Sequence, residues 1–445
     1  MRRERNGSVL TRFRSLHAVR VVIRRVGVHR VTLVAGLVQL PARRAVAHVL
    51  QRLPRNPRLV VMGSPLDRFA DNAAYLFVHM SEHQRSLRPV WISGSSEVVE
   101  RLREHGYRAE RRWSWRGVIA SARAGAYVYS AYRSDINAWL SAGAVSVSLW
   151  HGIPIKRIER DVGPPHEPRE DLLTRLTRLA REAPPDVVLS TSPFVTQCFS
   201  AAFGVPPDRC WELGYPRVDH LLAEPSQPPA ALVGNDGVWD RLASAPRVVG
   251  LFLTWRDDRA DDAIDEAFVR RLADMCNRHG ALLAYKAHYN VAPTAAPRDC
   301  VVLPPDGDLN AYLGLCDVLV TDYSSVALDF LLMGREVLYY MPDLAHYAAT
   351  RGFTVDPMCL PGTVTFDQVA LVEALENVLE ASAGWTASES DERFLREMWG
   401  NTDGRAARRI AAALESALGL PAETRPDAAG AAAPISGAVR ARSAS

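Results

Sequence analysis

The 445-residue sequence predicts an α/β protein built from two domains, each with a parallel sheet. Three observations predict this fold. From Pro57 onward, short apolar runs rich in Val alternate with helical apolar patterns, as in sheets that are buried on both faces. A stretch rich in Pro, Ala and Gly, 224–246, interrupts the alternation, which starts again at Arg247. The stretch 316–334 joins a Val-rich strand to a helix through an Asp-Tyr-Ser-Ser turn.

In the first half, the expected elements follow one another in strand–helix–strand order. A parallel sheet covered by helices on both faces follows from this order. We assign residues 57–223 to the first domain. Its expected strands are 58–62, 89–92, 126–129, 145–149 and 187–190, and its expected helices are 71–82, 97–105 and 193–203.

The second half repeats this order after the stretch 224–246, which we expect to be an interdomain linker. Residues 247–419 form the expected second domain. The last residues, 420–445, are rich in Ala, Pro, Ser and Arg, and this composition predicts a disordered tail. The expected strands of the second domain are 247–253, 281–286, 317–321 and 336–340, and its expected helices are 263–279, 326–333 and 405–418.

His151 directly follows the expected strand 145–149, within the motif Trp150-His151-Gly152-Ile153-Pro154. Ligands of open α/β sheets gather at the carboxyl ends of the strands. A histidine at this position could act as a general base on a hydroxyl group, because its pKa lies near the working pH. The alternative is a structural histidine that is hydrogen-bonded to a neighbouring loop.

The turn at Ser324 and Ser325 is a candidate anion site. Hydroxyl groups at a strand-to-helix turn can cap the helix, and the positive end of the helix then faces outward toward an anion such as phosphate. Asp329 follows Ser325 by four residues, so both lie on one helix face, where Asp329 could orient a hydroxyl or a substrate group. The alternative is an ordinary serine cap.

The basic residues are almost all arginine. Of 53 Lys and Arg residues only two are lysines, Lys156 and Lys286, and each lies within five residues of a histidine, His151 or His288. A compact ammonium group and a guanidinium do not substitute for each other at a tight site. This placement therefore indicates two functional Lys/His pairs, with chance as the alternative.

The N-terminal leader, 1–56, is strongly basic. Residues 1–58 contain fourteen arginines and a single acid, Glu4, with valines between the arginines. Such a segment could lie on an anionic membrane surface, or it could be a solvated arm or follow from a start codon placed too early. Its longest uncharged run has twelve residues, short of the roughly 20 that span a bilayer.

A stripe of leucines within 171–182 is either a second membrane-facing element or a helix packed on the core.

Two further observations exclude classes of protein. The six cysteines are far apart without a C-x-x-C pair, which argues against a disulfide framework or a zinc site and fits a reducing cytosol. Neither half contains a G-x-G-x-x-G or a Walker lysine motif, which argues against a dinucleotide cofactor and an ATPase.

Taken in chain order, the motifs resemble those of the CDP-glycerol glycerophosphotransferases, a family that includes teichoic acid primases and polymerases. The resemblance covers about residues 120–415. Two positions depart from the family pattern, Tyr289 in place of Pro and Val218 in place of Asn. The matching motifs are Trp150-His151-Gly152-Ile153-Pro154 with Lys156, Ser192-Pro193-Phe194, Gly214-Tyr215-Pro216-Arg217, Thr254-Trp255-Arg256, Lys286-x-His288, Cys316 to Ser325, Pro342-Asp343-Leu344 and Arg351-Gly352-Phe353.

The resemblance implies a GT-B-like fold, in which two Rossmann-type domains face an interdomain cleft. It implies transfer of a polyol phosphate, glycerol phosphate as the first choice, from a CDP-activated donor to a hydroxyl of a membrane-lipid-linked acceptor, with release of CMP. The first domain would bind the acceptor and the second the donor. The implied setting is peripheral, at the cytoplasmic face of an anionic membrane, without nucleic acid and without an obligatory cofactor or metal.

The residues with implied roles fall into three groups, which are the catalytic residues, the residues at the donor diphosphate and the residues that contact the acceptor or another anion. Two alternatives stay open: a GT-B glycosyltransferase that uses a nucleotide sugar, and a catalytically silent scaffold of a wall-assembly complex. The implied catalytic residues are His151, His288 and Asp329. The residues implied at the donor diphosphate are Lys286, Ser324, Ser325, Asp322 and Arg256. The residues implied to contact the acceptor or another anion are Lys156, Arg217 and Arg351.

Overall fold

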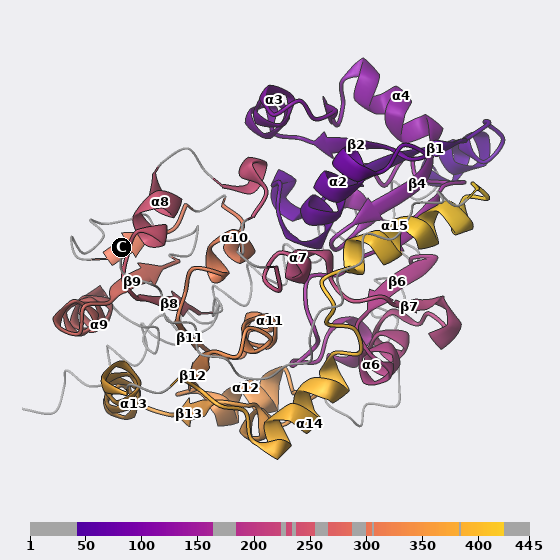
Figure 1. The fold of residues 1–445 in the computed structure, drawn as a ribbon. Coiled ribbons are helices and arrows are strands. Elements are labelled where there is room, and N and C mark those ends of the chain that lie inside the picture. Colours follow the sequence, from indigo (N-terminus) through magenta and orange to yellow (C-terminus); the bar gives the residue numbers. More distant parts are fainter. Residues whose placement is uncertain are drawn as a thin grey trace, which may run out of the picture.

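The computed structural model describes residues 42–162, 184–223, 228–233, 237–253, 266–286, 300–304, 307–381 and 384–421. Within this part, the chain forms two α/β domains, each with one parallel sheet (Figure 1). Several sequence expectations lie outside the described residues. These are the leader up to residue 41, the Leu stripe at 171–182, the site residues Arg256 and His288, and the tail beyond residue 421.

The first sheet has seven parallel strands in the order β3-β2-β1-β4-β5-β6-β7. The order reverses direction between β1 and β4, which makes the carboxyl ends of these strands the place where a ligand is expected. The strands are β1 (Asn56–Gly63), β2 (Arg88–Ser93), β3 (Ala109–Arg111), β4 (Ala124–Tyr129), β5 (Val145–Ser148), β6 (Val187–Ser190) and β7 (Cys210–Glu212). The helices are α2 (Asp71–His83), α3 (Ser96–Glu104), α4 (Trp115–Arg123), α6 (Pro193–Phe203) and α7 (Pro216–Asp219).

The second sheet has six parallel strands in the order β10-β9-β8-β11-β12-β13, which reverses between β8 and β11. The strands are β8 (Val248–Phe252), β9 (Leu282–Tyr285), β10 (Cys300–Val302), β11 (Val318–Thr321), β12 (Glu336–Tyr340) and β13 (Thr363–Thr365). The helices are α8 (Val238–Ala243), α9 (Glu266–Arg278), α10 (Leu309–Leu313), α11 (Val326–Leu331), α12 (Leu344–Thr350) and α13 (Gln368–Glu380). Two Rossmann-type sheets are therefore present, as the sequence predicts.

The central strands are apolar on both faces. In β1, Val60, Val61 and Met62 have no exposed surface, and all four residues of β11 are buried. Side chains on successive positions of a strand point to opposite faces, so both faces of each sheet lie under protein. This burial explains why continuous Val-rich runs, rather than alternating patterns, predicted these strands.

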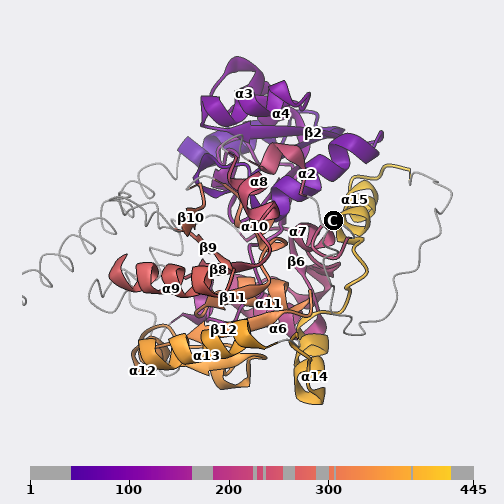
Figure 2. The ribbon, with the colours of Figure 1, turned by 60° about the vertical axis from the view of Figure 1, so that its left-hand side comes forward.

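The last two helices return to the first domain, unlike the predicted boundary at 247–419. Helix α14 (Glu389–Met398) packs on α6, and α15 (Ala406–Ala417) packs on α2 and α7 (Figures 1 and 2). The backbone N–H of Gly400 donates to the Thr191 carbonyl at 2.7 Å. Asp219 accepts hydrogen bonds from the N–H groups of Ala406 and Ala407, and so caps α15 with a residue almost two hundred positions earlier. No local pattern could indicate such a cap.

The expected linker 224–246 contains a helix and buried residues. Within its described residues, α8 packs against β10, and Leu232 and Leu242 are buried. At the other end of the first domain, residues 42–50 of the predicted leader are helical, and Leu50 is buried. Among the described residues, no helix has both the length and the apolar character needed to cross a bilayer.

Candidate functional site at the meeting edges of the two sheets

His151 follows β5 in a turn with unusual backbone angles. Trp150 has φ 51°, a left-handed value that is rare outside glycine, and Gly152 has φ 153°. The Trp150 indole is buried against Phe203, with ring centroids 4.8 Å apart, and the Asn72 amide donates to the Trp150 carbonyl at 3.0 Å. Trp150 therefore anchors the turn, while the imidazole of His151 is exposed.

The surroundings of His151 lower the pKa of its imidazole. The residue is exposed, yet it lies close enough to surrounding protein for desolvation to lower the pKa of its imidazole. The negative charge of Asp71 and a hydrogen bond with the Ser130 backbone oppose this shift, and the positive charges of Arg217 and Lys156 reinforce it. The net effect is a lowered pKa, which suits a residue that has to accept a proton.

The same turn leads into a direct pairing of the two domains. Lys156 and Phe353 form an antiparallel bridge, the Thr354 N–H donates to the Ile155 carbonyl at 2.9 Å, and the Arg157 N–H donates to the Gly352 carbonyl at 3.2 Å. The Lys156 ammonium lies 6.0 Å from the centroid of the Tyr347 ring. Lys156 and Arg351, which are far apart in the chain, therefore come from adjacent segments at this junction.

The Asp-Tyr-Ser-Ser turn follows β11 at the same junction. Asp322 and Tyr323 are buried, and the Tyr323 hydroxyl donates to Asp343 at 3.0 Å while its ring stacks on Tyr347. Ser324 and Ser325 are only partly buried. Their side chains cap helix α11 more weakly than the sequence predicts. Ser324 Oγ accepts from the Val326 N–H at 3.5 Å, and the Ser325 side chain makes no capping bond to α11.

Gly152 brings the His151 turn against the serine turn. A Cβ atom added at Gly152 would lie 2.1 Å from Ser325 Oγ, so the two backbones could not approach this closely with any other residue. The turn that carries His151 therefore meets Ser325 at Gly152, across the domain junction, which sequence separation alone did not reveal.

Gly152→Ala should lower turnover by about tenfold or more, because a misplacement of about 1 Å at a reacting centre is costly. The added methyl group has to displace Ser325 or the turn that carries His151. Gly280→Ala is the matched control, since Gly280 also has a positive φ, of 70°, but has no atom within 4 Å of an added Cβ. Equal turnover of the two variants would show that the contact with Ser325 has no role.

Arg217 and Asp329 form a buried ion pair between the domains. Arg217 Nη2 and Nε each lie 2.8 Å from Asp329 Oδ2, and Nη1 lies 2.7 Å from Asp71 Oδ1. Arg217 is 3% exposed and Asp329 1%. Burial opposes the charge of Arg217, but Asp329 and Asp71 raise its pKa. Burial raises the pKa of Asp329, and the Arg217 charge works against that shift. The two predicted site residues, Arg217 and Asp329, are therefore each other's ion-pair partner across the junction.

Four further residues of this network were missed by sequence reasoning. Asp71 lies at the first position of α2 with φ 61°, and its N–H donates to Asp308 Oδ1 at 3.1 Å. The Tyr75 hydroxyl donates to the same Asp308 carboxylate at 2.8 Å, and Asn72 Oδ1 accepts from the Arg217 N–H at 3.3 Å. Asp71 and Asn72 open an expected helix, where an acid is also an ordinary helix-start signal. Their pattern therefore did not single them out.

Lys286 follows β9 and is partly buried, and its ammonium donates to the Gly307 carbonyl at 3.3 Å. Strand β9 runs parallel to β8, and β8 runs parallel to β11, so the carboxyl ends of all three lie at one sheet edge. Lys286 therefore lies on the edge that also carries Ser324 and Ser325. His288 and Arg256, which follow β9 and β8, lie outside the described residues, and their roles stay predictions.

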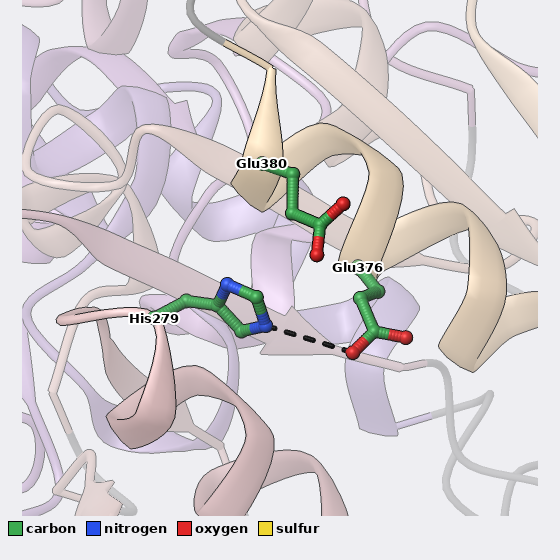
Figure 3. A group of neighbouring side chains, drawn as sticks. All are labelled: His279, Glu376 and Glu380. Carbon is green, nitrogen blue, oxygen red and sulfur yellow. Dashed lines mark ion pairs between the residues drawn. The ribbon is translucent and has the colours of Figure 1, made fainter.

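One group of side chains away from this edge could hold a metal ion. His279, Glu376 and Glu380 have ligand atoms within 4.8 Å of one another, with His279 and Glu376 paired at 3.6 Å (Figure 3). His279 lies between the end of α9 and the start of β9, hence at the amino end of the sheet. The group is partly exposed and belongs to the edge opposite the candidate site.

Two Rossmann-type domains whose carboxyl edges meet, with the His151 turn against the serine turn, have the architecture of the GT-B-like class of proteins. The sequence profile of the CDP-glycerol:poly(glycerophosphate) glycerophosphotransferases matches residues 45–416, and the chain belongs to this family of enzymes. The resemblance stated from the motifs is thereby confirmed.

Individual relatives agree with this assignment. The chain is 26% identical over 381 residues to a teichoic acid glycerol-phosphate transferase of Staphylococcus aureus, covering 81% of this chain and 94% of that one. It is 25% identical over 361 residues to a teichoic acid poly(glycerol phosphate) polymerase of Bacillus spizizenii, covering 76% and 86%. A polymerase of Staphylococcus epidermidis is 24% identical, but this chain covers only 44% of its length. The solved structure of the wall teichoic acid polymerase TagF superposes with a TM-score of 0.67 at 20% identity, covering 88% and 98%.

Proposed function

We propose that the protein transfers glycerol phosphate from CDP-glycerol to a hydroxyl group of a lipid-linked acceptor in teichoic-acid-like polymer synthesis. The observation that carries this proposal is that the turn containing His151 lies against the Ser324–Ser325 turn, through Gly152, in a chain of the glycerophosphotransferase family. The relatives named above act in teichoic acid synthesis with glycerol phosphate. A cytoplasmic, membrane-peripheral setting follows from the proposed acceptor and from the basic leader.

In the proposed reaction, the acceptor oxygen attacks the phosphorus that bears glycerol. A bond forms between these two atoms, the bond from that phosphorus to the CMP oxygen breaks, and CMP leaves. His151 accepts the proton of the acceptor hydroxyl, which its lowered pKa permits at neutral pH. Lys286, Ser324 and Ser325 come from the donor-domain edge and offer positive charge and hydroxyl groups to the diphosphate.

Arg217 and Asp329 receive a different role from the one implied by the sequence. Because each is the buried partner of the other, we propose that they hold the two domain edges together and position the His151 turn through Asp71 and Asn72. Asp322 and Arg351 remain candidates for donor and anion contacts, respectively. We propose no obligatory cofactor for this chemistry, because positioning and electrostatics supply most of the catalysis of phosphoryl transfer.

The proposal is tested by incubating the full chain with CDP-glycerol and a lipid-linked acceptor in liposomes. The molecular mass of the product is then measured by mass spectrometry. We expect products heavier than the acceptor by whole glycerol phosphate units, and a ladder of such products would identify a polymerase. Transfer only from a nucleotide sugar, with CDP-glycerol inert, would favour the glycosyltransferase alternative. Absence of any transfer would favour a scaffold.

The pH dependence of kcat/KM follows from the surroundings of His151. The active form has a neutral imidazole, and its pKa is lowered, so the acidic limb should lie below the ordinary histidine value of about 6.5. Lys156→Gln removes a charge that lowers this pKa and should move the limb to higher pH, whereas Asp71→Asn should move it to lower pH. An acidic limb that neither substitution moves would assign the titration to another group.

A further inference from the structure

Helix α4 presents apolar side chains to the solvent. Trp115 is 76% exposed and Ile119 is 40% exposed, and their spacing of four residues places them on one face of the helix. Trp113, just before the helix, is 66% exposed, while the opposite face buries Gly117 and Ser121. Scattered exposed apolar residues are ordinary, but this group gathers two tryptophans and an isoleucine on one short stretch, which marks an interaction surface.

Arginines surround these apolar side chains. Arg111, Arg116 and Arg123 are exposed, and we call them, together with Trp113, Trp115 and Ile119, the α4 patch. The one acid between residues 108 and 123 is Glu110, and it is paired with Arg103 at 2.7 Å. The patch is therefore positively charged and complementary to an anionic surface.

A recess of about 260 Å³ adjoins the patch. Arg111, Arg112 and Trp113 line it, together with Gly94 and Ser114. Gly94 follows β2 and Arg111 ends β3, so the recess opens at the carboxyl edge of the first sheet, the edge that also carries His151. Arg112 is paired with Asp67, which also accepts a hydrogen bond from the Gly94 N–H, so Arg111 supplies the positive charge that the recess offers to a phosphate-bearing headgroup.

We propose that the α4 patch docks the protein on the surface of an anionic bilayer. The tryptophans would lie at the level of the headgroups and the arginines would contact lipid phosphates, as in helices that lie in a membrane interface. Figures 1 and 2 both show α4 on the outside of the first domain, away from the second domain. The patch lies on the described fold and is distinct from the basic leader. The inference rests on the proposed function only in that a lipid-linked acceptor gives the docking a purpose.

The test compares binding of the full chain and its variants to vesicles of phosphatidylcholine alone and to vesicles that also contain phosphatidylglycerol. Trp113→Ala with Trp115→Ala should weaken binding to the anionic vesicles by about tenfold. Phe366→Ala with Val369→Ala is the matched control, because these exposed apolar residues lie on the second domain, at and just before the start of α13. Circular dichroism confirms that each variant is folded.

Fluorescence quenching tests whether the α4 patch contacts the bilayer even where the basic leader supplies most of the vesicle affinity. Brominated lipids should quench tryptophan fluorescence of the wild type, and Trp115→Phe should remove part of this quenching. Unchanged affinity together with unchanged quenching would overturn the proposal, as would a wild type that binds no vesicles. Self-association that only the patch variant loses, with vesicle binding unaltered, would assign the patch to a second copy and would also overturn it. Patch variants should keep full turnover with a water-soluble acceptor, so a failed docking proposal remains distinguishable from a failed function.

Discussion

His151→Ala should lower acceptor-dependent CMP release by at least about a hundredfold, the usual scale for loss of a general base. The reason lies in the turn that carries this histidine. The indole of Trp150 and the amide of Asn72 fix the turn, and the next residue after His151, Gly152, lies against Ser325 of the other domain. The surroundings of the imidazole lower its pKa, which favours the neutral form that accepts a proton. Steady-state turnover at saturating CDP-glycerol measures the effect.

His279→Ala is the control for this substitution, because His279 lies at the opposite edge of the second sheet. It should leave turnover unchanged. Calorimetric titration of CDP-glycerol into His151→Ala should give nearly the wild-type affinity, since we place the donor mainly on the second domain. Turnover of His151→Ala within about threefold of wild type would mean that another group accepts the proton.

Arg217→Ala should destabilise the protein by about 3–5 kcal/mol, because it leaves buried carboxylates without their cation. Among the described residues, Asp329 loses the cation with which it is paired, and Asp71 loses the same partner. Turnover should also fall, because the pair joins the edge that carries His151 to the edge that carries the serine turn. The free energy of unfolding in urea measures the first effect.

The double variant Arg217→Met/Asp329→Leu provides the control for this pair. Removing both charges avoids the unpaired carboxylate of Asp329, so it should be more stable than Arg217→Ala, and the double-mutant cycle should give a coupling of about 1–3 kcal/mol. Additive effects of the two single substitutions would contradict an interaction across the junction. Loss of turnover in a well-folded double variant would support the positioning role.

The fold was largely predictable because its strands are buried on both faces. The Val-rich runs at β1 and β11 are continuous, so local sequence was enough to locate them. Once the strands were placed, the parallel arrangement put His151, Lys286 and Ser324 at carboxyl edges. The family motifs then added the class of reaction, which strand patterns alone did not contain.

The junction itself was not predictable from local patterns. Arg217 reaches Asp329 over 112 positions, and Asp219 caps α15 over 187. Such contacts leave no periodic signal, because nothing in the segment of one partner indicates where the other partner lies. The short strands β3, β7 and β13 were missed for a similar reason, since three residues are too few for a recognisable alternation.

The most direct test of the proposed phosphotransfer follows the oxygen of the acceptor hydroxyl. An acceptor labelled with ¹⁸O at that hydroxyl is incubated with CDP-glycerol and the full chain. The masses of the released nucleotide and of the polymer are then measured separately by mass spectrometry. Attack on the phosphorus that bears glycerol predicts unlabelled CMP and ¹⁸O retained in the new phosphodiester. Release of CDP in place of CMP would contradict the account, because it would place the bond cleavage at the glycerol carbon and not at phosphorus.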